Sequence, residues 1–375
     1  MRDPAEGLRV TALTQQQADL RDVVGELMAA RSGESEVRRQ MAGDLGHEPA
    51  LWTELAGMGL LGLIIPEEYG GSGAGPAELS VVCEQMGGAL LCAPYLSTAV
   101  LTPYLLAELD DAAECAAVLP RIASGELIAT VAFAETGSAR PPDHPATVAH
   151  PGAAGWTLTG EKTYVLDAAT AGLFYVLAES ESGTGVFAVE RGATGMSVDP
   201  LETLDPTRRQ GRLTLADTPA RLIGATSGGS AVVTGALDRA AVALIAEQAG
   251  GALHAAQMAA DYARTRHQFG RAIGSFQAVK HMCVDMLLEA QSALSAARHV
   301  AAGDDSTASD LALAQAYCSE AFVFVAATNI QAHGGIGFTW EHPAHLYLRR
   351  ARTDAQIFGS PAWHRERYVR LQEER

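Results

Sequence analysis

Basic side chains are scarce in this 375-residue sequence, which has 27 Lys and Arg against 44 Asp and Glu and a formal net charge of −17. A protein that binds duplex DNA through its phosphates would normally carry the opposite balance. The same excess of negative charge disfavours contact with an anionic membrane surface. We therefore expect neither a nucleic acid nor a membrane among the partners.

Long hydrophobic runs are also lacking. Segments 59–65 and 240–246 are among the longest apolar runs, whereas a membrane span needs roughly 18 or more such residues. No apolar stretch follows residues 1–6, so we expect no signal peptide.

Closely spaced cysteines are missing too. The five cysteines are odd in number and scattered, without the close pairs typical of metal or redox sites. They are Cys83, Cys92, Cys115, Cys283 and Cys318. This usage fits a reduced compartment, so we expect a cytoplasmic protein without a metal site.

What remains is an ordinary globular composition, with 48% hydrophobic and 19% charged residues. At roughly 150 residues per domain, the length suggests two or three domains. The pattern of apolar, polar and turn-forming residues changes twice along the chain. These changes predict an α+β protein with an N-terminal helical domain (1–127), a middle β-domain (128–230) and a C-terminal helical bundle (231–375).

The predicted elements follow from hydrophobic spacing. Apolar residues recur at helical spacing in the first and last stretches, whereas short β-branched or aromatic runs separated by Gly, Pro and Asp fill the middle. The predicted helices cover 51–60, 77–89, 97–109, 236–265, 275–301 and 309–332, and the predicted strands 128–134, 156–159, 173–178, 186–189 and 212–215. Such strands favour a small β-barrel or sandwich, and three long apolar helices favour an antiparallel bundle.

Two motifs flank the bundle helices. Segment 266–273, RHQFGRAI, joins two helices, with Gln277 just beyond it. It is either a plain turn with Gly270 as breaker or an anion site in which Arg266 and Gln268 donate hydrogen bonds. The residues alone favour the turn. Segment 331–337, QAHGGIG, is either a glycine helix cap or a close backbone approach to a ligand.

Glu247 lies inside a very apolar helical segment, 244–251. Burial would raise its pKa, which suits a general base near neutral pH. The alternative is a carboxylate paired with a basic side chain or with a helix dipole. A serine hydrolase is disfavoured, because the glycines of 70–74 are not followed directly by a helix.

These motifs occur in an order that resembles the acyl-CoA dehydrogenase family along nearly the whole chain. The matching segments are 58–60 (MGL) with 65–71 (IPEEYGG), 158–162 (LTGEK), 266–277 and 331–337. The resemblance implies an N-terminal helical domain, a middle β-domain and a C-terminal four-helix bundle, the order expected above.

The resemblance also implies an FAD site that is shared between subunits. Tyr164 would pack against the isoalloxazine ring. The residues expected to reach the diphosphate and adenosine of a neighbour's FAD, or to line its path, are Arg266, Gln268, Phe269, Gln277, Gln331, Gly334 and Gly335. A dimer or tetramer would then be obligatory, either homomeric or heteromeric.

The family chemistry is α,β-desaturation of an acyl-CoA thioester. A carboxylate removes the α-proton while the β-hydrogen leaves as hydride for flavin N5, and hydrogen bonds stabilise the developing enolate. The family expectation for the electron acceptor is an electron-transfer flavoprotein.

The sequence departs from the family pattern at the expected base. The resemblance places Phe358 where a glutamate is usual, and the alternative position in some members falls near Ala240. Glu247 is therefore the most plausible base, on chemical grounds more than on alignment.

The flavin contacts depart as well. Ala134 and Leu166 stand where hydroxyl side chains are usual. Segments 204–209 and 333–343 resemble an actinobacterial branch in which several members act on sterol side chains, and some are heterotetramers whose two chains share each active site.

Three functions stay open. The chain could be an FAD-dependent acyl-CoA dehydrogenase that uses Glu247, a partner subunit that completes a site lying mainly on another chain, or a redox-neutral thioester enzyme on the same fold.

Overall fold

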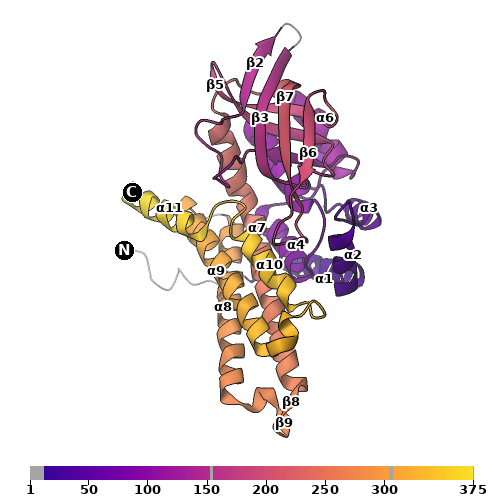
Figure 1. Ribbon diagram of the computed structural model, residues 1–375, viewed down its shortest axis with the longest axis vertical. Helices are drawn as coiled ribbons and strands as arrows, with labels where there is room; N and C mark the ends of the chain where they lie inside the picture. Colours follow the sequence, from indigo (N-terminus) through magenta and orange to yellow (C-terminus); the bar gives the residue numbers. More distant parts are fainter. Residues whose placement is uncertain (1–11, 153–154, 304–306, 375) are drawn as a thin grey trace.

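A computed structural model describes residues 12–152, 155–303 and 307–374. It confirms the predicted α+β class and the order of helices, strands and helices. The β-domain lies at one end of the molecule, the C-terminal bundle extends away from it, and the N-terminal helices pack against the side of their junction (Figure 1).

The N-terminal helices form the first layer of the core. They are α1 (Gln15–Arg31), α2 (Glu34–Ala42), α3 (Pro49–Gly57), α4 (Pro76–Gly88), α5 (Thr102–Leu109) and α6 (Ala112–Ala123). Thr14 caps α1 in a reciprocal capping box with Gln17, which satisfies two backbone N–H groups that the first turn leaves free. A π-helical turn, Tyr95–Leu101, leads into α5 and is buried throughout.

The middle domain is a sheet that closes on itself. Its strands are β1 (Ala129–Ala132), β2 (Val148–Gly152), β3 (Gly155–Leu166), β4 (Leu173–Ser180), β5 (Gly183–Glu190), β6 (Met196–Pro200) and β7 (Gln210–Ile223). The order is β1-β4-β2-β3-β7-β5, and β5 pairs back onto β4. Strands β4, β2, β3, β7 and β5 thus form a closed ring, to which β1 and β6 are each paired through one strand. Of the two predicted architectures the structure therefore adopts the barrel.

Three long helices and two shorter ones make the C-terminal domain. They are α7 (Gly229–Thr265), α8 (Gln277–Ala302), α9 (Ala308–His333), α10 (Ala344–Asp354) and α11 (Pro361–Glu373). A small hairpin, β8 (His267–Gln268) with β9 (Arg271–Ala272), joins α7 to α8 at the end farthest from the barrel (Figure 1). By length and composition α7 and the helical segment Ala308–Phe338, which includes α9, could cross a membrane, but 61% and 56% of their most apolar windows are buried, as is usual for core helices.

Two glycines bring α4 against α7. A Cβ atom at Gly87 would lie 2.0 Å from the carbonyl oxygen of Glu247, and one at Gly250 would lie 1.9 Å from that of Glu84. Only glycine allows the two backbones this approach. The contact holds the N-terminal domain directly against the helical turn that carries Glu247.

Candidate functional site

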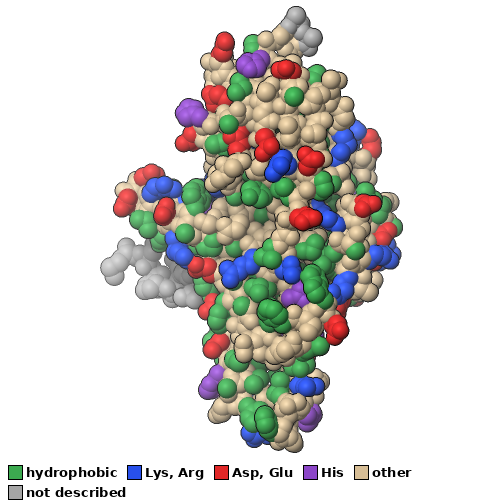
Figure 2. Space-filling model, viewed as in Figure 1, with side chains coloured by type: hydrophobic (Ala, Val, Ile, Leu, Met, Phe, Trp, Pro, Cys, Tyr) green, Lys and Arg blue, Asp and Glu red, His purple; other side chains and the backbone are tan. Residues whose placement is uncertain are grey.

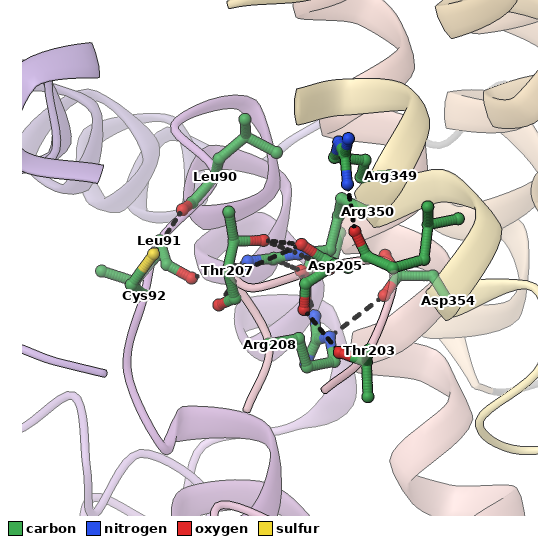
Figure 3. A network of polar contacts seen from close by, with 12 residues as sticks. Leu90, Leu91, Cys92, Thr203, Asp205, Thr207, Arg208, Arg349, Arg350 and Asp354 are labelled. Atoms are coloured by element: carbon green, nitrogen blue, oxygen red, sulfur yellow. Dashed lines mark hydrogen bonds and ion pairs between the residues drawn. The ribbon is translucent and has the colours of Figure 1, made fainter. Parts of the chain in front are cut away.

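Glu247 lies at a buried junction of all three domains. Arg208, from the loop before β7, and Arg350, from α10, both donate to the same oxygen, Oε1 of Glu247. Arg208 also donates through Nε to Oδ1 of Asp354 at 3.1 Å, and Arg350 through Nε to Oδ2 of Asp205 at 3.2 Å. We call these five residues the junction network, four of which are labelled in Figure 3.

Backbone groups complete the junction network. The Nη2 atom of Arg350 donates to the carbonyl oxygens of Leu91 and Thr207, both at 3.1 Å. Arg350 therefore joins α10 to the loop that follows α4 and to the loop that precedes β7 (Figure 3). Charge-assisted bonds of this kind are roughly twice as strong as neutral ones, so the network fixes how the three domains meet.

The expected rise in the pKa of Glu247 is wrong. Burial alone would raise it, but the guanidinium groups of Arg208 and Arg350 outweigh burial and hold the pKa of Glu247 below its ordinary value. The carboxylate is thus the paired form that was the alternative to a general base. By contrast, burial raises the pKa of Asp354 to about 7. The Glu247 carboxylate adds to this rise, whereas the guanidinium groups of Arg208 and Arg350 oppose it.

Little space exists beside Glu247. The adjoining cavity measures about 20 Å³ and is lined by Cys83, Met86, Tyr95 and Leu96 together with Glu247 and Arg208. Such a volume holds about one water molecule. An acyl chain would find no room there without displacing buried side chains.

A larger cavity lies between the barrel and the bundle and measures about 550 Å³. We call it the barrel–bundle cavity. Its walls include Val131, Phe133, Ala134, Tyr164, Leu166 and Phe358. Phe358, which stands where the family resemblance expects a glutamate, is only 1% exposed. Its carbonyl oxygen accepts a hydrogen bond of 3.1 Å from Nη1 of Arg140, so the ring is held in the cavity wall.

Tyr164 is the expected flavin-contacting residue that does reach the barrel–bundle cavity. The pairing of β3 with β7 is irregular between Lys162 and Val165, and Tyr164 adopts a positive φ of 53°. Such a bulge turns a side chain out of the regular alternation. The Tyr164 ring is 53% exposed and lines the cavity.

The other expected cofactor residues lie away from Tyr164. Arg266, Gln268, Phe269 and Gln277 share the hairpin end of the bundle, where Phe269 is 91% exposed and its ring lies edge-on to Phe276 at 6.1 Å. Hydrophobic side chains are visible on the surface of this end in Figure 2.

The glycine motif forms a third group at the carboxyl end of α9. Gln331, Gly334 and Gly335 are all exposed there. His333 is instead buried, stacked on Tyr262, and its Nδ1 lies 2.8 Å from the Asn329 carbonyl oxygen. Among the residues that the structure describes, no cluster of His, Cys, Asp or Glu is arranged to hold a metal ion. The single chain therefore does not bring its predicted cofactor residues into one site.

Sequence reasoning missed the residues around Glu247. Nothing in the sequence connects Arg208 and Arg350 with Glu247, although Arg208 lies in segment 204–209, one of the two segments that resemble the actinobacterial branch. Gln210, which is 7% exposed and lines the barrel–bundle cavity, was missed as well. The predicted strand 212–215 begins two positions after Gln210, so the sequence does not indicate where this side chain lies.

Comparison with known proteins identifies the fold at family level. The family model for the acyl-CoA dehydrogenase N-terminal domain matches residues 14–126, and that for the C-terminal domain matches 227–370. Acyl-CoA dehydrogenase IpdE2 of Mycobacterium tuberculosis is 34% identical over 358 residues, which cover 95% of this chain and 96% of the relative.

Comparison with solved structures supports the same family. The ChsE4–ChsE5 complex from Mycobacterium tuberculosis matches with a TM-score of 0.86 and 30% identity, covering 98% of this chain and 100% of the other. A variant of the Tcur3481–Tcur3483 steroid ACAD matches with the same TM-score and identity, covering 96% and 98%. The chain belongs to the acyl-CoA dehydrogenase family.

Proposed function

We propose that this chain is one subunit of a heteromeric, FAD-dependent acyl-CoA dehydrogenase whose second, homologous chain supplies the flavin pocket and the base. One observation carries the proposal. The two positions at which the family resemblance offers a base hold Phe358 and Ala240, while Glu247 is engaged by two arginines. The reaction of the assembly is α,β-desaturation of an acyl-CoA thioester.

FAD is the cofactor that membership of the family implies, and the chain fits its two ends unequally. The hairpin end offers an exposed guanidinium, an amide and an aromatic ring at Arg266, Gln268 and Phe269. These groups suit a diphosphate with an attached purine. An exposed half-site of this kind fits a cofactor whose remainder lies on another subunit.

The flavin end fits poorly. Ala134 and Leu166 offer no side-chain donor, and their carbonyl oxygens already accept hydrogen bonds from Thr163 N at 3.0 Å and Thr130 Oγ1 at 2.7 Å. An isoalloxazine ring has a polar edge that needs several partners. We therefore assign the flavin ring to the second chain.

Within the assembly, this chain's residues bind and orient. FAD supplies the hydride acceptor when bound. Arg266 would neutralise the diphosphate and Phe269 would cover the adenine, while Gln331, Gly334 and Gly335 allow the cofactor chain to pass close to the backbone.

The comparisons support further parts of the proposal. Two of the matching solved structures, ChsE4–ChsE5 and Tcur3481–Tcur3483, are named after two chains, and the second is a steroid ACAD. We accordingly propose a heterotetramer that acts on a steroid-type or other bulky acyl-CoA and passes electrons to an electron-transfer flavoprotein. The five cysteines are all free, so the proposed location remains the cytoplasm.

The test compares the chain alone with the chain coexpressed with a homologous neighbour. We expect a colourless chain alone, and a yellow complex that contains FAD and oxidises acyl-CoA substrates. Arg266→Ala should remove FAD from the complex, whereas Arg264→Ala, which alters an exposed arginine paired with Asp261 at 2.7 Å, should not.

Two outcomes would contradict the proposal. A yellow, active chain without a partner would make it a self-sufficient dehydrogenase. A complex that stays colourless in excess FAD, yet transforms thioesters, would favour a redox-neutral enzyme.

A further inference from the structure

We propose that a surface pocket of this chain, formed where the segment after α9 meets α10, docks the second, homologous chain through an apolar side chain and a neighbouring carboxylate of that chain. We call it the Trp340 pocket. It measures about 250 Å³, and its walls include Leu204, Phe338, Trp340, Arg349 and Arg352. The inference rests on the proposed function in one respect, because it requires a second chain. It goes further by naming the surface that this chain offers to the partner and the chemistry of the contact.

Large hydrophobic side chains around the Trp340 pocket are exposed to solvent. Phe338 is 82% exposed, Trp340 60% and Leu204 55%. Single exposed apolar residues are ordinary on a protein surface, whereas several gathered around one hollow mark an interaction site. On the face shown in Figure 2, hydrophobic and basic side chains gather over α10. This grouping indicates that a partner, and not solvent, covers the pocket in the assembly.

Trp340 is held in place although it is exposed. The guanidinium of Arg349 lies over its ring, 4.7 Å from the ring centroid, and the ring of His345 meets it edge-on with 4.7 Å between centroids. Arg349 is itself fixed, because its Nε donates to Nδ1 of His345 at 3.3 Å and its Nη1 to the carbonyl oxygen of Leu204 at 2.7 Å. His345 is buried and joins this group to the core. A tryptophan that is ordered before binding loses little entropy when a partner covers it.

The charge of the pocket is positive. Arg349 and Arg352 line it, and no acidic side chain is among the described residues that do so. Burial lowers the pKa of His345 to about 4, so its ring is neutral near pH 7. Arg352 is exposed and forms no ion pair within the described part of the chain. In a molecule with a formal net charge of −17, an unpaired guanidinium beside a second arginine suits a carboxylate supplied by a partner.

The place of the pocket along the chain identifies the second chain as its occupant. The proposed function assigns Gln331, Gly334 and Gly335 to the path of a cofactor held largely by that chain, and these residues lie just before Phe338 in the sequence. A partner close enough to share this cofactor passes over the same surface. Aromatic residues and arginine are also the types enriched at protein interfaces. A free anion could bind Arg352 but would leave the apolar rim uncovered.

The experiment measures the dissociation constant of the purified complex by sedimentation velocity over a dilution series. Trp340→Ala and Arg352→Glu should each weaken the complex by about 30-fold or more, as expected for the loss of an interface hot spot. Arg121→Glu makes the same charge reversal on α6, where the Arg121 side chain is 46% exposed, and should leave the dissociation constant unchanged. Thermal unfolding of each variant chain alone checks that its fold is intact.

A photochemical cross-link identifies what covers the pocket. Phe338 is replaced by p-benzoylphenylalanine, which puts the reactive group on a largely exposed side chain. Irradiation of the complex should join position 338 to a segment of the second chain that contains an Asp or Glu. The same replacement at Leu45, which is 51% exposed in the N-terminal domain, should give no such product. Changing that Asp or Glu to Arg in the second chain should restore assembly with Arg352→Glu.

Three results would overturn the inference. They are assembly that Trp340→Ala or Arg352→Glu leaves as strong as Arg121→Glu does, a cross-link from position 338 that reaches a second copy of this chain or nothing at all, and no rescue by the charge exchange. Each is compatible with a yellow, active complex, which would leave the proposed function intact. A yellow, active chain that needs no second chain would instead contradict the proposed function itself, and the unaltered protein alone would show it.

Discussion

Replacing Glu247 by Gln should destabilise this protein even when no substrate is present. Gln keeps the size of the side chain but removes the negative charge that Arg208 and Arg350 share. Both guanidiniums are at least 90% buried and cannot turn to solvent. Removing one partner of a buried ion pair leaves an uncompensated charge, which typically costs about 3–5 kcal/mol.

The cost should be visible in thermal unfolding of the chain alone. For a cooperative unit of 150–250 residues, about 2–4 °C of melting temperature corresponds to 1 kcal/mol, so the expected fall is roughly 6–20 °C. Glu108→Gln is the matched control. Glu108 pairs with Arg239 at 3.3 Å, and both side chains are at least one-third exposed, so the loss there should be at most about 1 kcal/mol.

Equal melting temperatures for Glu247→Gln and Glu108→Gln would refute this reasoning. If Glu247→Gln also abolished turnover of the complex without lowering its melting temperature, Glu247 would be restored as a candidate base. Loss of turnover together with loss of stability would be uninformative about catalysis, so both quantities belong in the same experiment.

Three further predictions follow from burial and packing. Burial raises the pKa of Asp354 to about 7, so between about pH 4 and pH 7 the folded state binds more protons than the unfolded state. The free energy of unfolding should therefore fall by up to roughly 1.4 kcal/mol per pH unit as the pH rises through this range. Asp354→Asn should flatten this slope in thermal unfolding experiments across the same range. Gly250→Ala places a Cβ atom 1.9 Å from the carbonyl oxygen of Glu84 and should cost about 1–3 kcal/mol or more in urea unfolding, whereas Gly57→Ala, with open space around it, should be neutral or add up to about 1 kcal/mol. Phe269→Ala should leave the melting temperature of the chain alone unchanged, because Phe269 is 91% exposed, but should weaken FAD binding by the complex roughly 2- to 10-fold in a fluorescence titration.

The sequence predicted the elements whose burial is periodic or continuous. The predicted strands 173–178 and 186–189 were recognisable as apolar runs because β4 and β5, which contain them, are buried almost throughout. It missed β2 and β6, each of which contains a proline and few buried positions. Short strands with so few buried positions carry no alternating apolar pattern to detect. Their pairing is decided by the neighbouring strands that need partners.

The sequence predicted the site only at positions whose residue type is informative without knowledge of its neighbours in space. The place of Phe358 and the exposed hairpin around Phe269 were visible as departures from, or agreements with, the family pattern. The sign of the pKa shift at Glu247 was not visible. It depends on Arg208, 39 positions away, and on Arg350, 103 positions away, and sequence spacing does not reveal such a meeting.

The junction network and the barrel–bundle cavity are linked through α10. Arg350 anchors this helix to the loop before β7, and the same helix leads directly into the segment that places Phe358 in the cavity wall. A buried ion pair is weak evidence of net stability, because desolvation offsets much of the attraction. The junction network acts here on geometry. Its buried charges cannot reach solvent, so they hold α10 in place, and α10 in turn positions the wall of the barrel–bundle cavity. The open volume lies against the barrel, where Phe358 stands at the position of the usual base, whereas the cavity beside Glu247 measures about 20 Å³.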